Sequence, residues 1–225
     1  MDIHTSCEQK LVIATRNEGK RREFEQMLRP LGFQVLSLVD FPDISDIAET
    51  GTTFAENAHI KARATADALG FAVIADDSGL AVQKLNGAPG VYSARYAGED
   101  ATDEANIRKL LSELKRLKAH EQPVSEVTVR TGGKRKLLSE AAFICSIVYL
   151  NPLEDGGVDT ITVEGRLEGG IVDEPSGDGG FGYDPVFYVS KYEATMAELT
   201  SDQKNAVSHR GQALQKLLHK LRSKR

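Results

Sequence analysis

The sequence predicts an α/β fold in which a mixed β-sheet is flanked by helices. Two observations predict this class. In the first half of the chain, short apolar runs alternate with helical patterns, which is typical of parallel strands joined by helices. In the second half, the apolar runs 141–150 and 160–168 follow one another across the turn residues Asn151 and Pro152, which predicts an antiparallel hairpin.

The individual elements follow from residue spacing and punctuation. The strand candidates are apolar or β-branched runs bounded by turn residues: 11–14, 34–38, 71–75, 127–129, 141–150, 160–168 and 186–189. The helix candidates carry apolar residues three or four positions apart: one from about 20 to 30, one from 53 to 70, one from 101 to 118, and one from about 202 or 205 to 221. Thr53 and Glu56 have the spacing of a capping box, and Gly70 suits a helix end.

Composition excludes several classes of protein. The net charge of -5 and the pI of about 5.6 argue against nucleic acid as a partner, because phosphate backbones are bound by an excess of Lys and Arg. No apolar run is long enough to cross a bilayer, so no membrane partner is expected. Cys7 and Cys145 lie far apart without metal-ligand spacing, so we expect neither a disulfide framework nor a zinc site. A reducing, cytoplasmic location fits best.

A polar loop, Thr15-Arg16-Asn17-Glu18-Gly19-Lys20, stands where the first helix is expected to begin. Backbone N–H groups at a helix N-terminus attract anions, and a hydroxyl, an amide and an ammonium accompany them here. Phosphate is therefore a natural ligand. The alternative is a polar turn that only caps the helix, since the P-loop pattern is absent.

Two adjacent acids, Asp76 and Asp77, are expected to follow the end of the apolar strand 71–75. Crowded carboxylates are costly unless a cation neutralises them, and Mg²⁺ is held by one or two carboxylates together with substrate phosphates. Asp77 with Glu49 or Glu56 is thus a candidate metal site. In the alternative interpretation, Asp77 or Ser78 caps a turn while Asp76 faces water.

Two further segments carry groups suited to a nucleotide base. The loop Gly179–Pro185 exposes Phe181 among glycines, where a ring can stack on a base, although such loops are also common as tight turns with a core phenylalanine. The sequence Ser208-His209-Arg210, expected near the start of the last helix, combines a hydroxyl, an imidazole and a guanidinium. A histidine in isolation is more often structural than functional.

Taken together, these segments resemble the Ham1 family of inosine/xanthosine triphosphate pyrophosphatases. The resemblance rests on seven collinear blocks between about residues 11 and 218: Thr15–Lys20, Glu49–Gly51, Thr53–Ala58, Ala75–Leu80, Gly87–Arg95, Gly180–Pro185 and Lys204–Gly211. It implies a Ham1/ITPase-like fold and hydrolysis of ITP, dITP and XTP at the α-phosphorus. The products would be a nucleoside monophosphate and pyrophosphate.

The resemblance also implies roles for individual residues. Asp77 would be the catalytic residue, binding Mg²⁺ with Glu49 and activating or orienting water. The implied substrate-binding residues are Thr15, Arg16, Asn17, Glu18, Gly19, Lys20, Lys61, Ser78, Phe181, Gly182, Tyr183, Asp184, Lys204, His209 and Arg210. Of these, Thr15, Asn17, Lys20 and Lys61 would hold the triphosphate, and Phe181 would stack on the purine. Lys204, His209 and Arg210 would read the base or stabilise phosphate charge. A homodimer is implied as well.

The resemblance divides the chain into a single domain over residues 11–222 and an N-terminal extension over residues 1–10. Segment 119–136 is longer than the family pattern leads one to expect, so we interpret it as an insert that forms an exposed loop or irregular hairpin. Neither segment contains an implied catalytic residue.

Three other functions compete with this interpretation. A Maf-like enzyme would act on modified pyrimidine or methylated nucleotides, and Ser208-His209-Arg210 argues against it. A nucleotide sensor would bind triphosphates without turnover, which the paired acids make less attractive. An aspartyl-phosphate phosphatase would need a DxD spacing that is missing at Asp76-Asp77.

Overall fold

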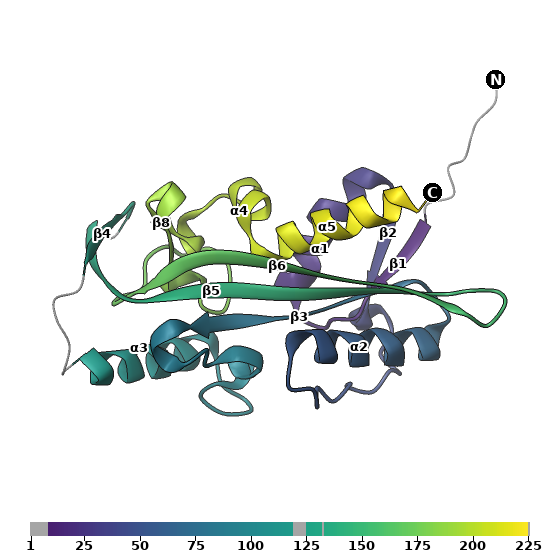
Figure 1. Cartoon of the computed structure of the whole chain (residues 1–225), viewed down its shortest axis with the longest axis horizontal. Helices are drawn as coiled ribbons and strands as arrows, with labels where there is room; N and C mark the ends of the chain where they lie inside the picture. Colours follow the sequence, from purple (N-terminus) through teal and green to yellow (C-terminus); the bar gives the residue numbers. More distant parts are fainter. Residues whose placement is uncertain (1–8, 119–124, 132, 225) are drawn as a thin grey trace, which may run out of the picture. The chain divides into compact units, whose positions relative to one another are not determined.

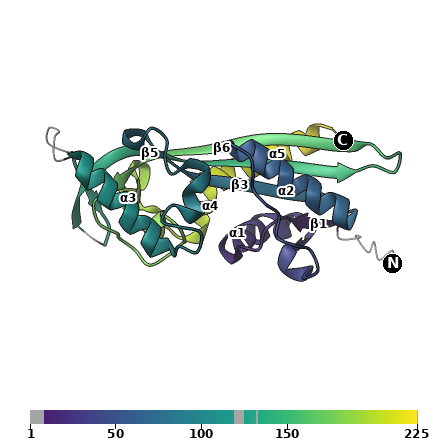
Figure 2. The ribbon, with the colours of Figure 1, turned by 90° about the horizontal axis from the view of Figure 1, so that it is seen from below.

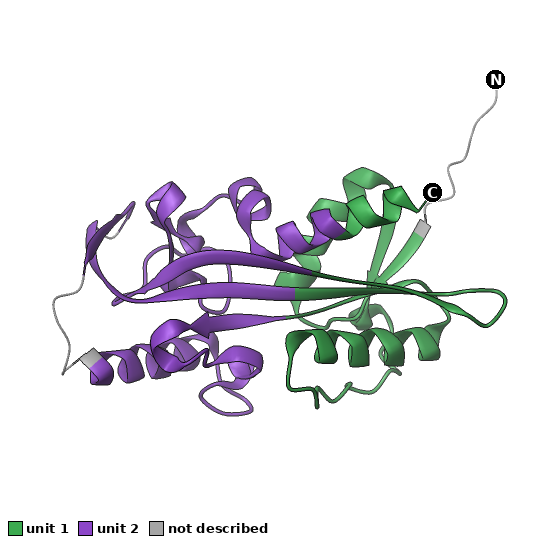
Figure 3. Ribbon diagram, in the orientation of Figure 1, with its two compact units in different colours: residues 1–77, 146–163, 217–225 green, residues 78–145, 164–216 purple. Residues whose placement is uncertain are grey.

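The computed structural model describes residues 9–118, 125–131 and 133–224. The chain forms two compact units, which Figure 3 shows in two colours. Unit 1 comprises Met1–Asp77, Ser146–Val163 and Leu217–Arg225, and unit 2 comprises Ser78–Cys145 and Glu164–Lys216. The boundary between residues 77 and 78 falls inside a strand.

The strands form one mixed sheet, as predicted (Figure 1). Within the described residues it has eight strands in the order β2-β1-β3-β5-β6-β7-β8, with β4 also paired to β5. Their bounds are β1 Gln9–Ile13, β2 Phe33–Ser37, β3 Val73–Val82, β4 Glu126–Val129, β5 Gly133–Pro152, β6 Val158–Val172, β7 Phe187–Val189 and β8 Ala194–Thr195. β1 pairs in parallel with β2 and β3, whereas β6, β7 and β8 pair antiparallel.

Unit 1 contains α1 (Glu18–Leu28) and α2 (Phe54–Leu69). α2 begins at the predicted capping box, in which Thr53 and Glu56 bond each other's backbone N–H, and ends at Gly70 in the left-handed conformation. The apolar residues on its buried face are alanines, which pack with apolar residues of β1, β3 and β5. Small side chains let the backbone of α2 lie close to the strands. The polar residues that α2 carries are therefore held close to the strands as well.

Unit 2 contains α3 (Asp103–Lys118), α4 (Ser201–Val207) and the first part of α5 (His209–Ser223). The predicted apolar stripe of α3 is confirmed for Ile107, Leu110, Leu111 and Leu114, which are buried with residues of β5, β6 and β7, whereas Leu117, also predicted for this stripe, is exposed. Figures 1 and 2 both show β5 and β6 running side by side as a long hairpin. Both strands of this hairpin extend beyond the predicted ranges 141–150 and 160–168 at each end.

Two boundaries differ from the sequence-based expectation. β3 does not end before the acids but continues through Asp76 and Asp77 to Val82, because neighbouring lysines neutralise the buried carboxylates. The last helix is interrupted at Ser208, whose backbone is extended (φ -61°, ψ 151°), so that α4 and α5 are separate helices. His209 consequently becomes the first residue of α5.

The predicted insert is partly described. Val127–Val129 belong to β4, which pairs antiparallel with residues 133–136, so the predicted strand and hairpin are confirmed there. Residues 119–124 and 132, like residues 1–8 of the predicted extension, lie outside the described residues. The single domain and the insert stay predictions. None of the described helices combines the length and apolarity needed to cross a membrane.

Candidate active site

Both adjacent acids of β3 are buried. Asp76 is 1% exposed, and Lys20 of α1 contacts it with Nζ 3.1 Å from Oδ2. The alternative interpretation, in which Asp76 faces water, is therefore wrong. Sequence reasoning also missed the pairing with Lys20, because residues 56 positions apart give no local signal of their contact.

Asp77 shares a lysine with Glu49. Lys61 of α2 donates from Nζ to Glu49 Oε1 at 2.7 Å, and the same ammonium lies 3.9 Å from Asp77 Oδ1. Asn57, one helical turn earlier, donates from Nδ2 to Asp77 Oδ2 at 3.0 Å. Glu49 and Asp77 thus converge on one point of unit 1, as the resemblance implies. Glu56, the other candidate, is instead engaged in the helix cap.

The charges of this cluster determine its protonation. Burial raises the pKa of Asp77, as does the nearby Glu49 carboxylate, although Lys61, Lys20 and Asn57 act in the opposite direction. Burial lowers the pKa of Lys61, but the carboxylates of Asp76, Asp77 and Glu49 outweigh it, so the net pKa is raised. Lys61 therefore stays positively charged and can compensate negative charge on the carboxylates beside it.

The loop before α1 has the predicted position. Asn17 caps the helix by accepting from the Lys20 backbone N–H at 3.0 Å, and the Asn17 backbone N–H donates to Thr15 Oγ1 at 3.1 Å. Arg16 points elsewhere: it donates to the carbonyl of Leu38 at 2.8 Å and to Asp46 at 3.0 Å. These bonds tie the loop to the segment after β2. Phosphate contacts by Arg16, Glu18 and Gly19 stay predictions.

A second cluster lies in unit 2, around Phe181. The Lys204 ammonium of α4 lies 4.7 Å from the centre of the Phe181 ring, and the Arg210 guanidinium of α5 lies 5.9 Å from it. Arg210 is buried and donates to Ser78 Oγ at 2.8 Å. An aromatic face beside two cations suits the stacking and hydrogen bonding of an oxo-purine.

Asp184 organises this aromatic loop. Its Oδ2 accepts from the Lys204 ammonium at 2.7 Å and from the Phe181 backbone N–H at 3.1 Å. Gly180 allows this close approach, since a Cβ there would lie 2.1 Å from the same oxygen. From α3, Asp103 accepts from the Gly182 N–H at 2.6 Å, a contact that sequence reasoning missed.

Tyr183 and His209 face the interior of unit 2. The Tyr183 hydroxyl donates to the Ser93 carbonyl at 2.9 Å, and burial raises the pKa of this tyrosine far above its usual value. The His209 ring is stacked on Phe143, with ring centres 4.9 Å apart. α5 can approach β6 at this point because residue 165 is glycine: a Cβ there would lie 1.9 Å from the His209 carbonyl oxygen. These contacts fix the position of the loop that carries Tyr183 and of the start of α5. Direct contacts of Tyr183 and His209 with a base stay predictions.

Comparison with known proteins identifies the family. The model of the Ham1 family matches residues 11–220. The chain belongs to the Ham1 family. Among curated relatives, the dITP/XTP pyrophosphatase of Bacillus subtilis (strain 168) is 50% identical over 206 residues, covering 92% of this chain and 93% of that protein. The dITP/XTP pyrophosphatase of Geobacter sulfurreducens is 51% identical over 205 residues, covering 91% and 92%.

Solved structures agree with this membership. The Ham1 protein of Staphylococcus aureus has a TM-score of 0.75 and 42% identity, covering 96% of this chain and all (100%) of that one. The HAM1 protein of Coxiella burnetii has a TM-score of 0.77 and 40% identity, covering 96% and 99%. The Ham1-like mixed sheet predicted from the sequence is confirmed.

The described residues hold no group of three or more His, Cys, Asp or Glu side chains that could bind a metal ion by themselves. The pair Glu49 and Asp77 offers hard oxygen ligands of the kind that Mg²⁺ prefers, and substrate phosphates commonly complete such a site. The donor set therefore fits a divalent cation whose remaining ligands would be water in the free protein and phosphate oxygens in the substrate complex.

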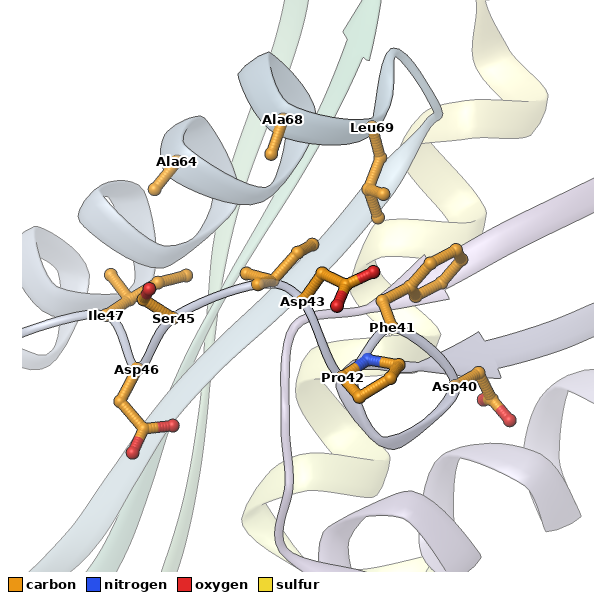
Figure 4. A pocket seen from close by; sticks show the side chains of 11 residues that line it. Asp40, Phe41, Pro42, Asp43, Ser45, Asp46, Ile47, Ala64, Ala68 and Leu69 are labelled. Carbon is orange, nitrogen blue, oxygen red and sulfur yellow. The ribbon is translucent and has the colours of Figure 1, made fainter.

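A separate pocket in unit 1, of about 750 Å³, lies between the segment 40–47 and α2 (Figure 4). Ala64, Ala68 and Leu69 of α2 face Phe41 and Ile47 across it. Asp40, Asp43 and Asp46 belong to the same segment, and no Lys or Arg among the described residues lines the pocket. Because an apolar pocket edged by acids repels phosphate, this is not the triphosphate site.

Proposed function

We propose that the chain hydrolyses non-standard purine nucleoside triphosphates (dITP, ITP and XTP) to the monophosphate and pyrophosphate. The observation that carries the proposal is the convergence of Asp77 and Glu49 on Lys61 in unit 1. Support comes from Ham1 relatives about 50% identical that are dITP/XTP pyrophosphatases. Glu49 and Asp77 lie in two of the blocks by which the sequence resembles the family, Glu49–Gly51 and Ala75–Leu80.

The phosphate chemistry is assigned to unit 1. Asp77 and Glu49 would hold Mg²⁺, which when bound draws charge from the phosphate oxygens and lets a nucleophile approach. Asp77 would also orient or deprotonate the water that attacks the α-phosphorus. Lys20 and Lys61 would neutralise the triphosphate, with Thr15 and Asn17 donating hydrogen bonds from the loop. Pyrophosphate then leaves with its charge compensated by these lysines.

Base recognition is assigned to unit 2. Phe181 would stack on the purine, while Lys204, His209 or Arg210 would donate to the 6-oxo group of hypoxanthine or xanthine. ATP has an amino group at that position, so a donor would face a donor. A site built around such a hydrogen bond rejects the wrong partner by roughly 10⁴-fold. Ser78, Gly182, Tyr183 and Asp184 would shape the pocket.

A substrate panel tests the proposed reaction and its metal dependence. We expect pyrophosphate release from dITP, ITP and XTP in the presence of Mg²⁺, little release from ATP, GTP, CTP or UTP, and none in excess EDTA. Each competing function predicts another result. Orthophosphate release would indicate a phosphatase. Activity confined to pyrimidine nucleotides would indicate a Maf-like enzyme, and triphosphate binding without turnover would indicate a sensor.

Replacing Phe181 by alanine tests the base site. We expect substrate binding to weaken by about 1–3 kcal/mol, the usual contribution of a base stacked on an aromatic ring. The measurement is the Kd of a non-hydrolysable dITP analogue, with inorganic triphosphate as the control ligand because it has no base. An unchanged Kd for the analogue would place the Phe181 ring in a structural role instead.

A homodimer and a cytoplasmic location complete the proposal. Family resemblance supports the dimer. The sequence has only two cysteines, Cys7 and Cys145, which lie far apart, and this fits a reducing compartment. Sedimentation velocity of the purified chain at micromolar concentration is expected to give a mass near twice 24.5 kDa. A single species of monomer mass would rule out the dimer under those conditions.

A further inference from the structure

The side chain of Asn57 connects two parts of the carboxylate cluster. It is completely buried, near the start of α2. Its Nδ2 donates to Asp77 Oδ2 at 3.0 Å, and its Oδ1 accepts from the backbone N–H of Gly51 at 2.8 Å. Burying an amide is costly unless both of its ends are bonded, and this amide uses its two ends on two different segments.

The two bonded segments are those that carry the two acids. Gly51 lies two residues after Glu49, whose carboxylate meets Lys61, and Lys61 lies four residues after Asn57 on the same face of α2. α2 therefore presents an amide and an ammonium to Asp77 and to the Glu49 segment. Together they fix where the two carboxylates lie relative to each other.

The fit around Asn57 is close. A Cβ added to Gly51 would lie 2.7 Å from Asn57 Oδ1 and 2.6 Å from Glu56 Cβ. Only glycine lets the segment after Glu49 approach α2 closely enough for the hydrogen bond. The contact thus depends on both residues, Gly51 and Asn57.

An amide has an advantage over a further lysine at this position. A neutral donor orients the Asp77 carboxylate through Oδ2 without adding a charge that would compete with a metal cation. The other oxygen of Asp77, Oδ1, then lies on the side of the Lys61 ammonium, which also contacts Glu49. Hydrogen bonds of this kind commonly orient metal-binding carboxylates, and their loss costs 10- to 100-fold in metal affinity.

We propose that Asn57 is a positioning residue that holds Asp77 and the Glu49 segment at the separation needed to bind a divalent cation. The inference rests on the proposed function in one respect, namely that these two carboxylates bind the metal. Asn57 itself touches neither the substrate nor the metal in this proposal. Its effect passes entirely through the geometry of the two acids.

The test is Mn²⁺ binding to the full-length protein without substrate, followed by electron paramagnetic resonance. We expect Asn57→Ala to weaken Mn²⁺ binding about 10- to 100-fold while circular dichroism stays unchanged. Asn106→Ala is the matched control. Asn106 is likewise a buried asparagine whose side chain makes two hydrogen bonds. Its Oδ1 accepts from Ala97 N–H at 2.7 Å and its Nδ2 donates to the Ala94 carbonyl at 3.0 Å, and both bonds lie in unit 2. Its Mn²⁺ affinity should stay within twofold of that of the unmodified protein.

A second variant, Gly51→Ala, keeps Asn57 but disrupts its bond to the Glu49 segment, and it decides the question if Asn57→Ala does not fold. We expect it to weaken Mn²⁺ binding as well. If Asn57→Ala or Gly51→Ala folds and binds Mn²⁺ as tightly as the unmodified protein, the inference about Asn57 is wrong, while the proposed function is unaffected. If the unmodified protein binds no Mn²⁺, the metal site of the proposed function falls together with it.

Discussion

Asp77→Asn is expected to lower kcat for dITP by about 10³-fold or more while the protein stays folded. The substitution is nearly isosteric, so the asparagine oxygen can still accept from Asn57 Nδ2, which now donates to Asp77 at 3.0 Å. It removes the negative charge that would bind the metal and activate water. It also removes an acid whose burial is unfavourable, so the free energy of unfolding should not fall.

The control for this variant is Asp67→Asn on the exposed face of α2. Asp67 pairs with Arg63 at 2.9 Å, and both side chains are 60% exposed, so the same chemical change is made without touching the cluster. The kcat of this control should match that of the unmodified protein. Steady-state kinetics at saturating Mg²⁺, with thermal melts of each variant, separate lost chemistry from lost folding. Hydrolysis by Asp77→Asn at more than a tenth of the normal rate would remove Asp77 from the catalytic role.

Much of the fold could be predicted because its signals are local. The capping box of Thr53 and Glu56 and the terminal Gly70 define α2 within the range of one helix, and the stripe around Leu110 and Leu114 defines the buried face of α3. The prediction that β3 ends before Asp76 was wrong for the opposite reason. Acids are uncommon inside strands, and here Lys20 of α1 and Lys61 of α2 compensate them, contacts that no local sequence pattern shows.

The candidate site was predictable in its residue types but not in its connections. The family resemblance indicated Asp77, Glu49 and Lys61, and the structure places these side chains together. Asn57 and Asp103 were missed, since each acts through a contact with a segment remote in sequence. An asparagine in a helix gives no sign from sequence alone that its amide is buried between two acidic segments. Such partners follow only from the three-dimensional packing.

Lys20→Met is expected to lower the free energy of unfolding by about 3 kcal/mol, because it removes a cation that pairs with the buried Asp76 carboxylate. The Asp76 side chain is fully buried, and Lys20 Nζ lies 3.1 Å from its Oδ2. For a chain of this size, such a loss corresponds to a fall in Tm of roughly 6–12 °C. Methionine fills a similar volume, so the effect reports the lost charge rather than a cavity.

A double-mutant cycle with Asp76→Asn separates this pairing from other effects. Asp76→Asn alone should cost less than Lys20→Met, since the Lys20 side chain is 16% exposed and its ammonium can turn toward water. Adding Asp76→Asn to Lys20→Met should restore part of the lost stability, because the uncompensated charge disappears. Arg63→Met, which breaks an exposed pair on α2, should change stability by no more than about 0.5 kcal/mol. If Lys20→Met changes it as little, then Lys61, which is also drawn to Asp76, neutralises that carboxylate without help.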